Sequence, residues 1–156
     1  MDNGTMVTVV ILIAITGFAI LLANFSRKKY EKRMLKKIAD FAAIHQSTLN
    51  ESEYWGKSGI GIDEQKSVLV FLQDLNDTTT AECIKLSDIE RCKTVNQGRD
   101  VNGIGKVIDK LQLVMYPYGH KGEIVLEFYN AEVSMQLHDE LLIIEKWAKK
   151  INAHLS

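Results

Sequence analysis

The sequence has no charged side chain between Asp2 and Arg27. Within that interval residues 6–25 read MVTVVILIAITGFAILLANF, and 20 helical residues rise about 30 Å, the thickness of a bilayer's hydrocarbon core. A buried helix of a soluble protein seldom runs this long without a polar face. A cleaved signal peptide would carry positive charge before a shorter apolar run and a small-x-small site after it. We therefore expect a transmembrane helix at residues 6–25, preceded by a short extracytoplasmic tail at residues 1–5.

Basic side chains are missing before this apolar run and crowded after it. Only one acid, Glu31, accompanies seven bases, which we call the basic collar: Arg27, Lys28, Lys29, Lys32, Arg33, Lys36 and Lys37. Because Lys and Arg beside a span stay on the cytoplasmic side, we expect a single-pass protein of the cell (inner) membrane, with its N-terminus outside. The collar should also contact anionic lipid in the bilayer, at about 1 kcal/mol per charge. Beyond Lys37 stand 12 of the 19 basic and 18 of the 20 acidic residues, so the collar carries +6 and the remainder −6.

Cysteine is scarce, with Cys83 and Cys92 alone. In a reducing compartment both should be free thiols, whereas in an exported domain they would be the obvious disulfide pair. Neither they nor the four histidines show ligand spacing such as C-x2-C or H-x3-H. We therefore expect no metal site and no cofactor, and interpret both cysteines as small, half-buried strand residues.

Catalytic motifs are absent too: the sequence has no G-x-S-x-G, no P-loop and no G-x-G-x-x-G. The triplet 138–140 (His-Asp-Glu) cannot converge on one substrate, because adjacent helical residues point in different directions, and a helix N-terminus explains it better. Residues 59–61 and 103–105 are isolated G-x-G pieces, a weak signal. We expect no catalytic residue, no enzyme and no nucleic-acid partner.

Neither glycine nor proline separates the expected span from the segment that follows it. There, apolar residues recur at spacings of three and four: Tyr30, Met34, Leu35, Ile38, Phe41 and Ala42, with His45 on the same side. This predicts a basic amphipathic neck at residues 26–46, continuous with the span as one long helix. Residues 6–46 are also where a homo-oligomer would form.

After the neck the pattern changes. Polar residues predict a loop at 46–57, and we assign residues 47–55 to a linker. Apolar residues then predict strands, separated by turns at 63–65, 74–79 and 116–122 and by a glycine-containing loop at 96–105. The expected strands are 58–62, 65–73, 81–86, 91–95, 106–116 and 123–129. A final apolar stripe that begins at Leu137 and includes Trp147 predicts a closing helix.

The order of these pieces resembles that of bacterial PH-like domains over residues 56–155. The resemblance is carried by Gly61-Ile62-Asp63-Glu64 leading into Val68–Leu72, Ile84-Lys85-Leu86-Ser87-Asp88-Ile89, Leu111-Gln112-Leu113, Glu127-Phe128-Tyr129-Asn130 and the Trp147 helix. It implies a seven-stranded, bent antiparallel β-barrel closed at one end by the C-terminal helix. With the transmembrane helix that the apolar run predicts, we expect an N-terminal transmembrane helix followed by an α+β, PH-like domain at residues 56–156. Such folds host lipid-head-group binding, peptide binding and scaffolding, so no function follows from the fold.

One departure from that family bears on lipid binding. PH domains that bind inositol phosphates resemble one another in a basic loop between their first and second strands. Here we equate that loop with Asp63-Glu64-Gln65, which one Lys66 follows. Two carboxylates would repel a phosphorylated ligand, so phosphoinositide recognition there is not expected.

Tyr54 and Trp55 are two adjacent aromatic residues in a polar stretch near the membrane. They either contact the interface or a partner, or Trp55 tucks under the barrel as a lid. Our leading hypothesis is a membrane-tethered, non-enzymatic module that binds an unidentified protein partner, with the neck holding it off the bilayer. The alternative is a structural subunit of a larger membrane complex, which the small-residue face at Ala19–Ala23 favours. Lipid-head-group sensing is a third reading.

Overall fold

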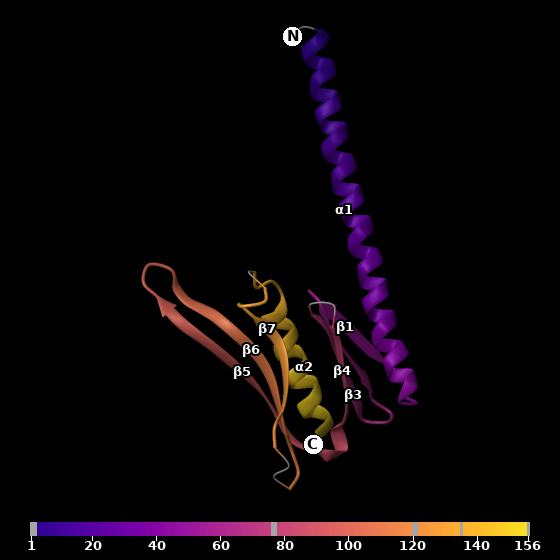
Figure 1. Ribbon diagram of the computed structural model, residues 1–156, viewed down its shortest axis with the longest axis vertical. Helices are drawn as coiled ribbons and strands as arrows, with labels where there is room; N and C mark the ends of the chain where they lie inside the picture. Colours follow the sequence, from indigo (N-terminus) through magenta and orange to yellow (C-terminus); the bar gives the residue numbers. More distant parts are fainter. Residues whose placement is uncertain (1–2, 76–77, 120–121, 135, 156) are drawn as a thin grey trace.

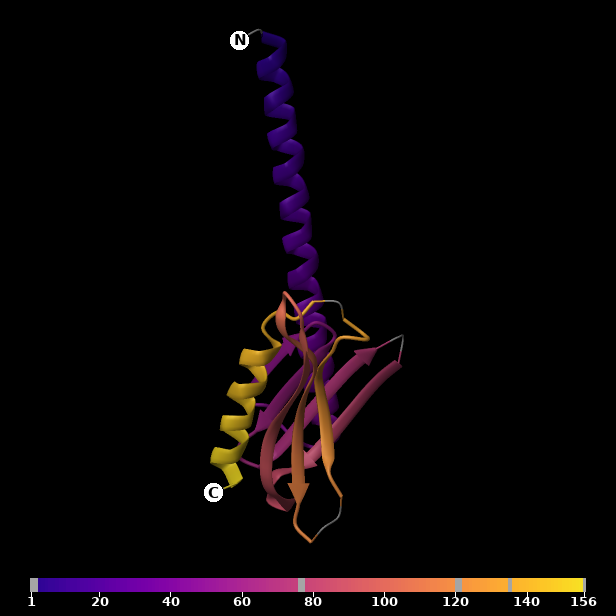
Figure 2. The ribbon, with the colours of Figure 1, turned by 90° about the vertical axis from the view of Figure 1, so that its left-hand side faces the viewer.

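The computed structural model describes residues 3–75, 78–119, 122–134 and 136–155. A long helix, α1 (Asn3–Ile44), extends from a body made of two antiparallel sheets and a second helix, α2 (Glu140–Leu155) (Figures 1 and 2). Sheet A contains β1 (Glu51–Trp55), β2 (Ser58–Asp63), β3 (Val68–Leu75) and β4 (Thr78–Lys85) in that order. A 3-10 turn, η1 (Leu86–Asp88), leads to sheet B, which contains β5 (Ile89–Val101), β6 (Gly105–Pro117) and β7 (Ile124–Asn130). The fold is therefore α+β, with a long apolar helix at its N-terminus.

The expected span and the expected neck are two halves of one uninterrupted helix of 42 residues. No side chain from residue 4 to residue 29 is buried, and the first half of α1 is long and apolar enough to cross a bilayer. The hydroxyls of Thr8 and Thr16 donate to the carbonyls of Gly4 and Leu12, so these polar groups are satisfied within the helix. Residues 3–5 of the short tail expected at residues 1–5 are already helical, because α1 begins at Asn3.

The neck half of α1 packs on the outer face of sheet A. Met34, Ile38 and Ala42 are fully buried there, in a cluster with Val68, Val70 and Leu72 of β3. The approach is close, because a Cβ atom at Gly59 of β2 would overlap the Cδ1 atom of Ile38. This explains the glycine-rich piece at residues 59–61 by packing. The neck is thus a layer of the domain, and the domain boundary that we expected after residue 46 is wrong.

The main core lies between the two sheets and is completed by α2. Trp147 and Ile151 of α2 are fully buried against Ile62, Leu113 and other residues of both sheets. Lys146 and Lys150 of α2 bind Glu51 of β1 at 3.0 and 2.5 Å, and these two ammonium groups, Lys150 first, hold the pKa of the Glu51 carboxyl below its usual range. The C-terminal helix is therefore fixed to the free edge of sheet A as well as to the core.

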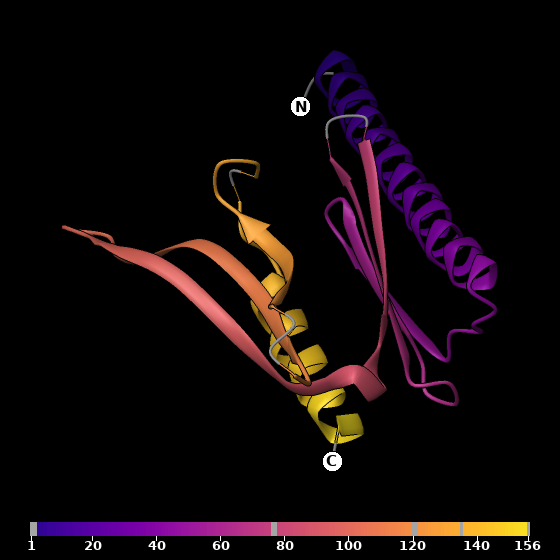
Figure 3. The same ribbon diagram turned by 60° about the horizontal axis from the view of Figure 1, so that its bottom comes forward.

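The closed barrel that the resemblance implied is not formed by the described residues, because no strand of sheet A pairs with a strand of sheet B. Figure 3 shows the two sheets splayed apart, with α2 between them. Side chains bridge the seam instead: Trp55 Nε1 donates to the carbonyl of Phe128 at 2.9 Å, and Gln73 Nε2 to that of Glu127 at 3.3 Å. Lys146 and Lys150 of α2 bind the side-chain carboxylates of β1 beside this seam.

Two further expectations about the strands were wrong. The stretch assigned to a linker at residues 47–55 contains β1, whose two acidic side chains, Glu51 and Glu53, form ion pairs with α2. The loop expected at 96–105 is the projecting end of a hairpin, in which β5 pairs with β6 as far as Val101 opposite Gly105. Both faces of that end are exposed, so no alternation marked it as strand. The turns expected at 74–79 and 116–122 contain residues 76–77 and 120–121, which lie outside the described residues.

Candidate functional site

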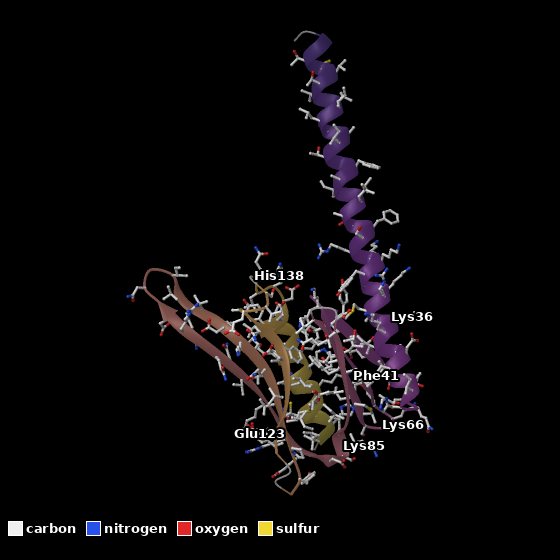
Figure 4. The ribbon with its side chains drawn as sticks, viewed as in Figure 1. Lys36, Phe41, Lys66, Lys85, Glu123 and His138 are labelled. Carbon is white, nitrogen blue, oxygen red and sulfur yellow. The ribbon has the colours of Figure 1, made fainter. Side chains whose placement is uncertain are left out.

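A cleft opens at the end of the body from which the span emerges. Its walls are Ser26, Arg27 and Tyr30 of α1, the end of β1 and the connection between β7 and α2, including His138. A second hollow shares Trp55, Gly56, Ser134 and Glu140 with it and continues along the seam between the sheets, past Gln73, Phe128 and Val133. We call the two together the juxtamembrane cleft. Figure 4 shows His138 at this end of the domain, on the side of the body that faces the N-terminal half of α1.

The charges in this cleft are mixed. Arg27 and Lys57 line it together with Glu127, Asp139 and Glu140. The Glu140 side chain is buried, and its carboxylate accepts the backbone N–H of His138 at 2.5 Å. Since α2 begins at Glu140, this contact ties the backbone just before the helix to its first residue, which gives Glu140 a structural role at the start of α2.

The two aromatic residues that the sequence singled out have separate positions. Trp55 is buried, with its ring stacked on Phe128 at a centroid distance of 4.4 Å, and forms the floor of the cleft. Tyr54 is half-buried and meets Tyr30 of α1 edge-to-face at 6.4 Å. Burial, helped by nearby Asp74, raises the pKa of Tyr30. Trp55 is therefore packed inside the body, as one of the alternatives expected, although the described residues form no closed barrel for it to cover, and its ring is not free to reach a bilayer.

The basic collar divides into a free part and a bound residue. Six of its members are exposed, and Figure 4 shows Lys36 on the free side of α1. Lys37 instead binds Asp74 of β3 at 2.7 Å, and this ammonium group holds the pKa of the Asp74 carboxyl below its usual range. Arg27 is the collar residue that lines the cleft.

The acidic turn at residues 63–65 lies at the opposite end of the domain. Asp63 is buried and accepts the backbone N–H groups of Lys66 and Thr48, which lower its pKa. Lys66 reaches the carbonyl of Gln46, just beyond α1, at the end of the body remote from the span (Figure 4). In the structure the first and second strands, β1 and β2, are joined by Gly56 and Lys57, and the turn at residues 63–65 instead leads from β2 toward β3. The Gly56-Lys57 turn is short and has one base, so it too lacks a cluster of cations.

The two cysteines lie outside the cleft and apart from each other. Cys83 packs at the neck side of sheet A and Cys92 lies in the main core, and both thiols are free. Burial raises the pKa of Cys92 to about 12, so this thiol is inert. Over the described ranges, no three His, Cys, Asp or Glu side chains come together in a group that could hold a metal ion.

Comparison of the chain with models of protein families, with curated proteins and with solved structures finds no match. The chemistry of the site must therefore be argued from its own residues. The cleft offers an aromatic floor, dispersed charges and exposed apolar edges such as Val133, with neither a paired nucleophile and base nor a clustered set of cations among its described residues. Such a surface is suited to recognition. The sequence did not predict the part of the cleft that follows β7, because residues 131–139 have neither a helical nor a strand-like apolar period.

Proposed function

We propose that this chain is a membrane-tethered, non-enzymatic interaction module whose PH-like domain binds a protein partner at the cytoplasmic face of the membrane. The four-plus-three arrangement of antiparallel strands, followed by a C-terminal helix between the sheets, supports the PH-like assignment. The juxtamembrane cleft is the observation that carries the proposal, because it is formed jointly by the tether and by the domain. We propose this cleft as the partner site.

The height of the cleft follows from the helix. Tyr30 lies five residues after Phe25, the last residue of the apolar run, and five helical residues rise about 7.5 Å. A bilayer's head-group region is about 5–8 Å thick on each side. Since Tyr30 already contacts Tyr54 of β1, the domain begins directly below the head groups. Our expectation that the neck holds the domain away from the bilayer is therefore replaced: a partner in the cleft would itself lie at the membrane surface.

Topology is the first test of this proposal. A reporter fused after Ser156 should be active only in the cytoplasm, because the collar charges remain on that side. Replacing the six exposed collar residues by glutamine should scramble the orientation, and Lys37 is left unchanged because it binds Asp74 within the fold. A fusion of the unaltered chain that is active outside the cell would contradict the proposed orientation.

The second test is selective loss of a partner. Val133 lines the cleft and is 52% exposed, whereas Val125 lies outside it on β7 and is 43% exposed. Val133→Glu should abolish co-purification of a cytosolic protein with the tagged full-length chain from detergent extracts, because a charge would occupy the apolar edge of the site. Val125→Glu, the same change at a matched valine, should leave that protein bound.

The rival functions give different outcomes in the same purification. Membrane subunits that co-purify stoichiometrically with both variants would favour the structural subunit. If no protein distinguishes Val133→Glu from Val125→Glu, the cleft is not the partner site. Lipid-head-group sensing would require a purified chain that discriminates between head groups, which the single lysine in the Gly56-Lys57 turn does not favour.

A further inference from the structure

The projecting end of the β5–β6 hairpin is unlike the rest of the body. From Asn96 to Lys106 every residue is exposed except Val101, which is half-buried. At its tip Ile104 is 77% exposed, the highest value among the exposed large apolar side chains that the structure describes, those of the span included. It is flanked by Gly103 and Gly105, whose φ angles of +84° and +92° make the tight turn that holds the isoleucine outward. An isolated tip of this kind has no partner within the described chain.

The hairpin points toward the membrane. Figures 1 and 2 share their vertical axis, along which α1 runs, and in both the tip of the β5–β6 hairpin is the part of the body that rises furthest toward the N-terminal half of α1. If residues 6–25 span the bilayer as proposed, the contact between Tyr30 and Tyr54 would bring the upper end of the body directly beneath the head groups. A tip that extends beyond this end would then be level with the interfacial layer of the bilayer.

The charge of the hairpin is compatible with that position. Residues 96–110 contain three bases, Arg99, Lys106 and Lys110, and two acids, Asp100 and Asp109, for a net +1, whereas the chain beyond Lys37 carries −6. Arg99 partly neutralises Asp109, at 3.4 Å. An apolar side chain beside basic residues is the combination by which peripheral segments enter an anionic interface.

We propose that the tip of the β5–β6 hairpin inserts Ile104 into the interfacial layer of the bilayer that α1 spans. This inference rests on the proposed membrane tether and goes beyond it. A single helix leaves the body free to turn about the helix axis, whereas a second contact at the far side of the body fixes which way the juxtamembrane cleft faces. The ligand of this second contact is the anionic phospholipid surface.

An environment-sensitive fluorophore on Ile104→Cys tests the insertion. The full-length chain carries Cys83→Ser, while Cys92 stays because it is buried and inert. The protein is reconstituted in vesicles of phosphatidylcholine and phosphatidylglycerol, with or without nitroxide-labelled lipid. Two further sites calibrate the signal: Ile15→Cys in the span, and Tyr118→Cys just beyond the opposite end of β6, where the side chain is 54% exposed.

The expected result is blue-shifted emission and nitroxide quenching at residues 104 and 15, with neither at residue 118. Quenching at residue 15 together with water-like emission at residue 104 would overturn the insertion and leave the tether intact. A blue shift at residue 104 without quenching would mean a protein contact, which also overturns it. No quenching at residue 15 would refute the tether itself.

Discussion

Replacing Trp147 by alanine should lower the free energy of unfolding by about 3–5 kcal/mol. The indole is fully buried in the core between the two sheets, and its Nε1–H donates to the carboxylate of Glu53 at 2.8 Å. Alanine would leave a cavity in the core and would remove one donor from that carboxylate. Because the stability of a domain is commonly about 5–15 kcal/mol, the substitution should remove a large share of it.

Urea denaturation of a fragment comprising residues 26–156, followed by circular dichroism, measures this effect. Leu142→Ala is the matched control, since Leu142 lies on the same helix but is 68% exposed. Its free energy of unfolding should change by less than about 0.5 kcal/mol. Equal denaturation midpoints for Trp147→Ala and the unaltered fragment would show that α2 does not complete the core.

Removing the neck should prevent the remaining domain from folding stably. A fragment of residues 47–156 would expose the outer face of β3 and lose the buried side chains of Met34, Ile38 and Ala42. Truncating one buried Met or Ile costs about 2–5 kcal/mol, so the loss of the whole layer is comparable with the stability of a domain. The exposed apolar face would in addition favour aggregation.

Circular dichroism melts of fragments 47–156 and 26–156 test this prediction directly. Within the longer fragment, Ile38→Ala should destabilise the fold by about 2–5 kcal/mol, and Lys36→Ala, an exposed position on the same helix, should be nearly neutral. A cooperative transition of the 47–156 fragment at the temperature of the longer one would show that the neck is dispensable.

Local patterns predicted a good part of this fold. The neck helix, β2, β6, β7 and α2 have a period that shows in the sequence, and the span and β3 are continuous apolar runs. The strand β1 has no such period, because polar residues occupy positions that face the fold. Its acids are paired with lysines of α2 more than 90 residues away, which no local pattern can show. The outer half of β5 was not predicted because both of its faces are exposed to solvent, so its side chains show no alternation of apolar and polar residues.

The candidate site was predicted less well than the fold. Tyr54 and Trp55 were singled out as a pair, but only the stacking of Trp55 on Phe128 and the contact of Tyr54 with Tyr30 show that one is a floor and the other a wall. The amphipathic stripe of the neck was predicted, whereas its partner was not, because the outer face of β3 is part of a continuous apolar run that hides which side chains face outward.

Because α1 is continuous, the span and the body are held at a fixed rotation relative to each other about the helix axis. Successive residues of an α-helix are about 100° apart around its axis, and no glycine or proline interrupts α1 between Phe25 and Tyr30, where a hinge would otherwise absorb a change. One residue added in that interval would shift the body by only about 1.5 Å along the axis but would turn it by about a quarter of a revolution. The number of residues between Phe25 and Tyr30 therefore sets which face of the domain lies in line with a given face of the span.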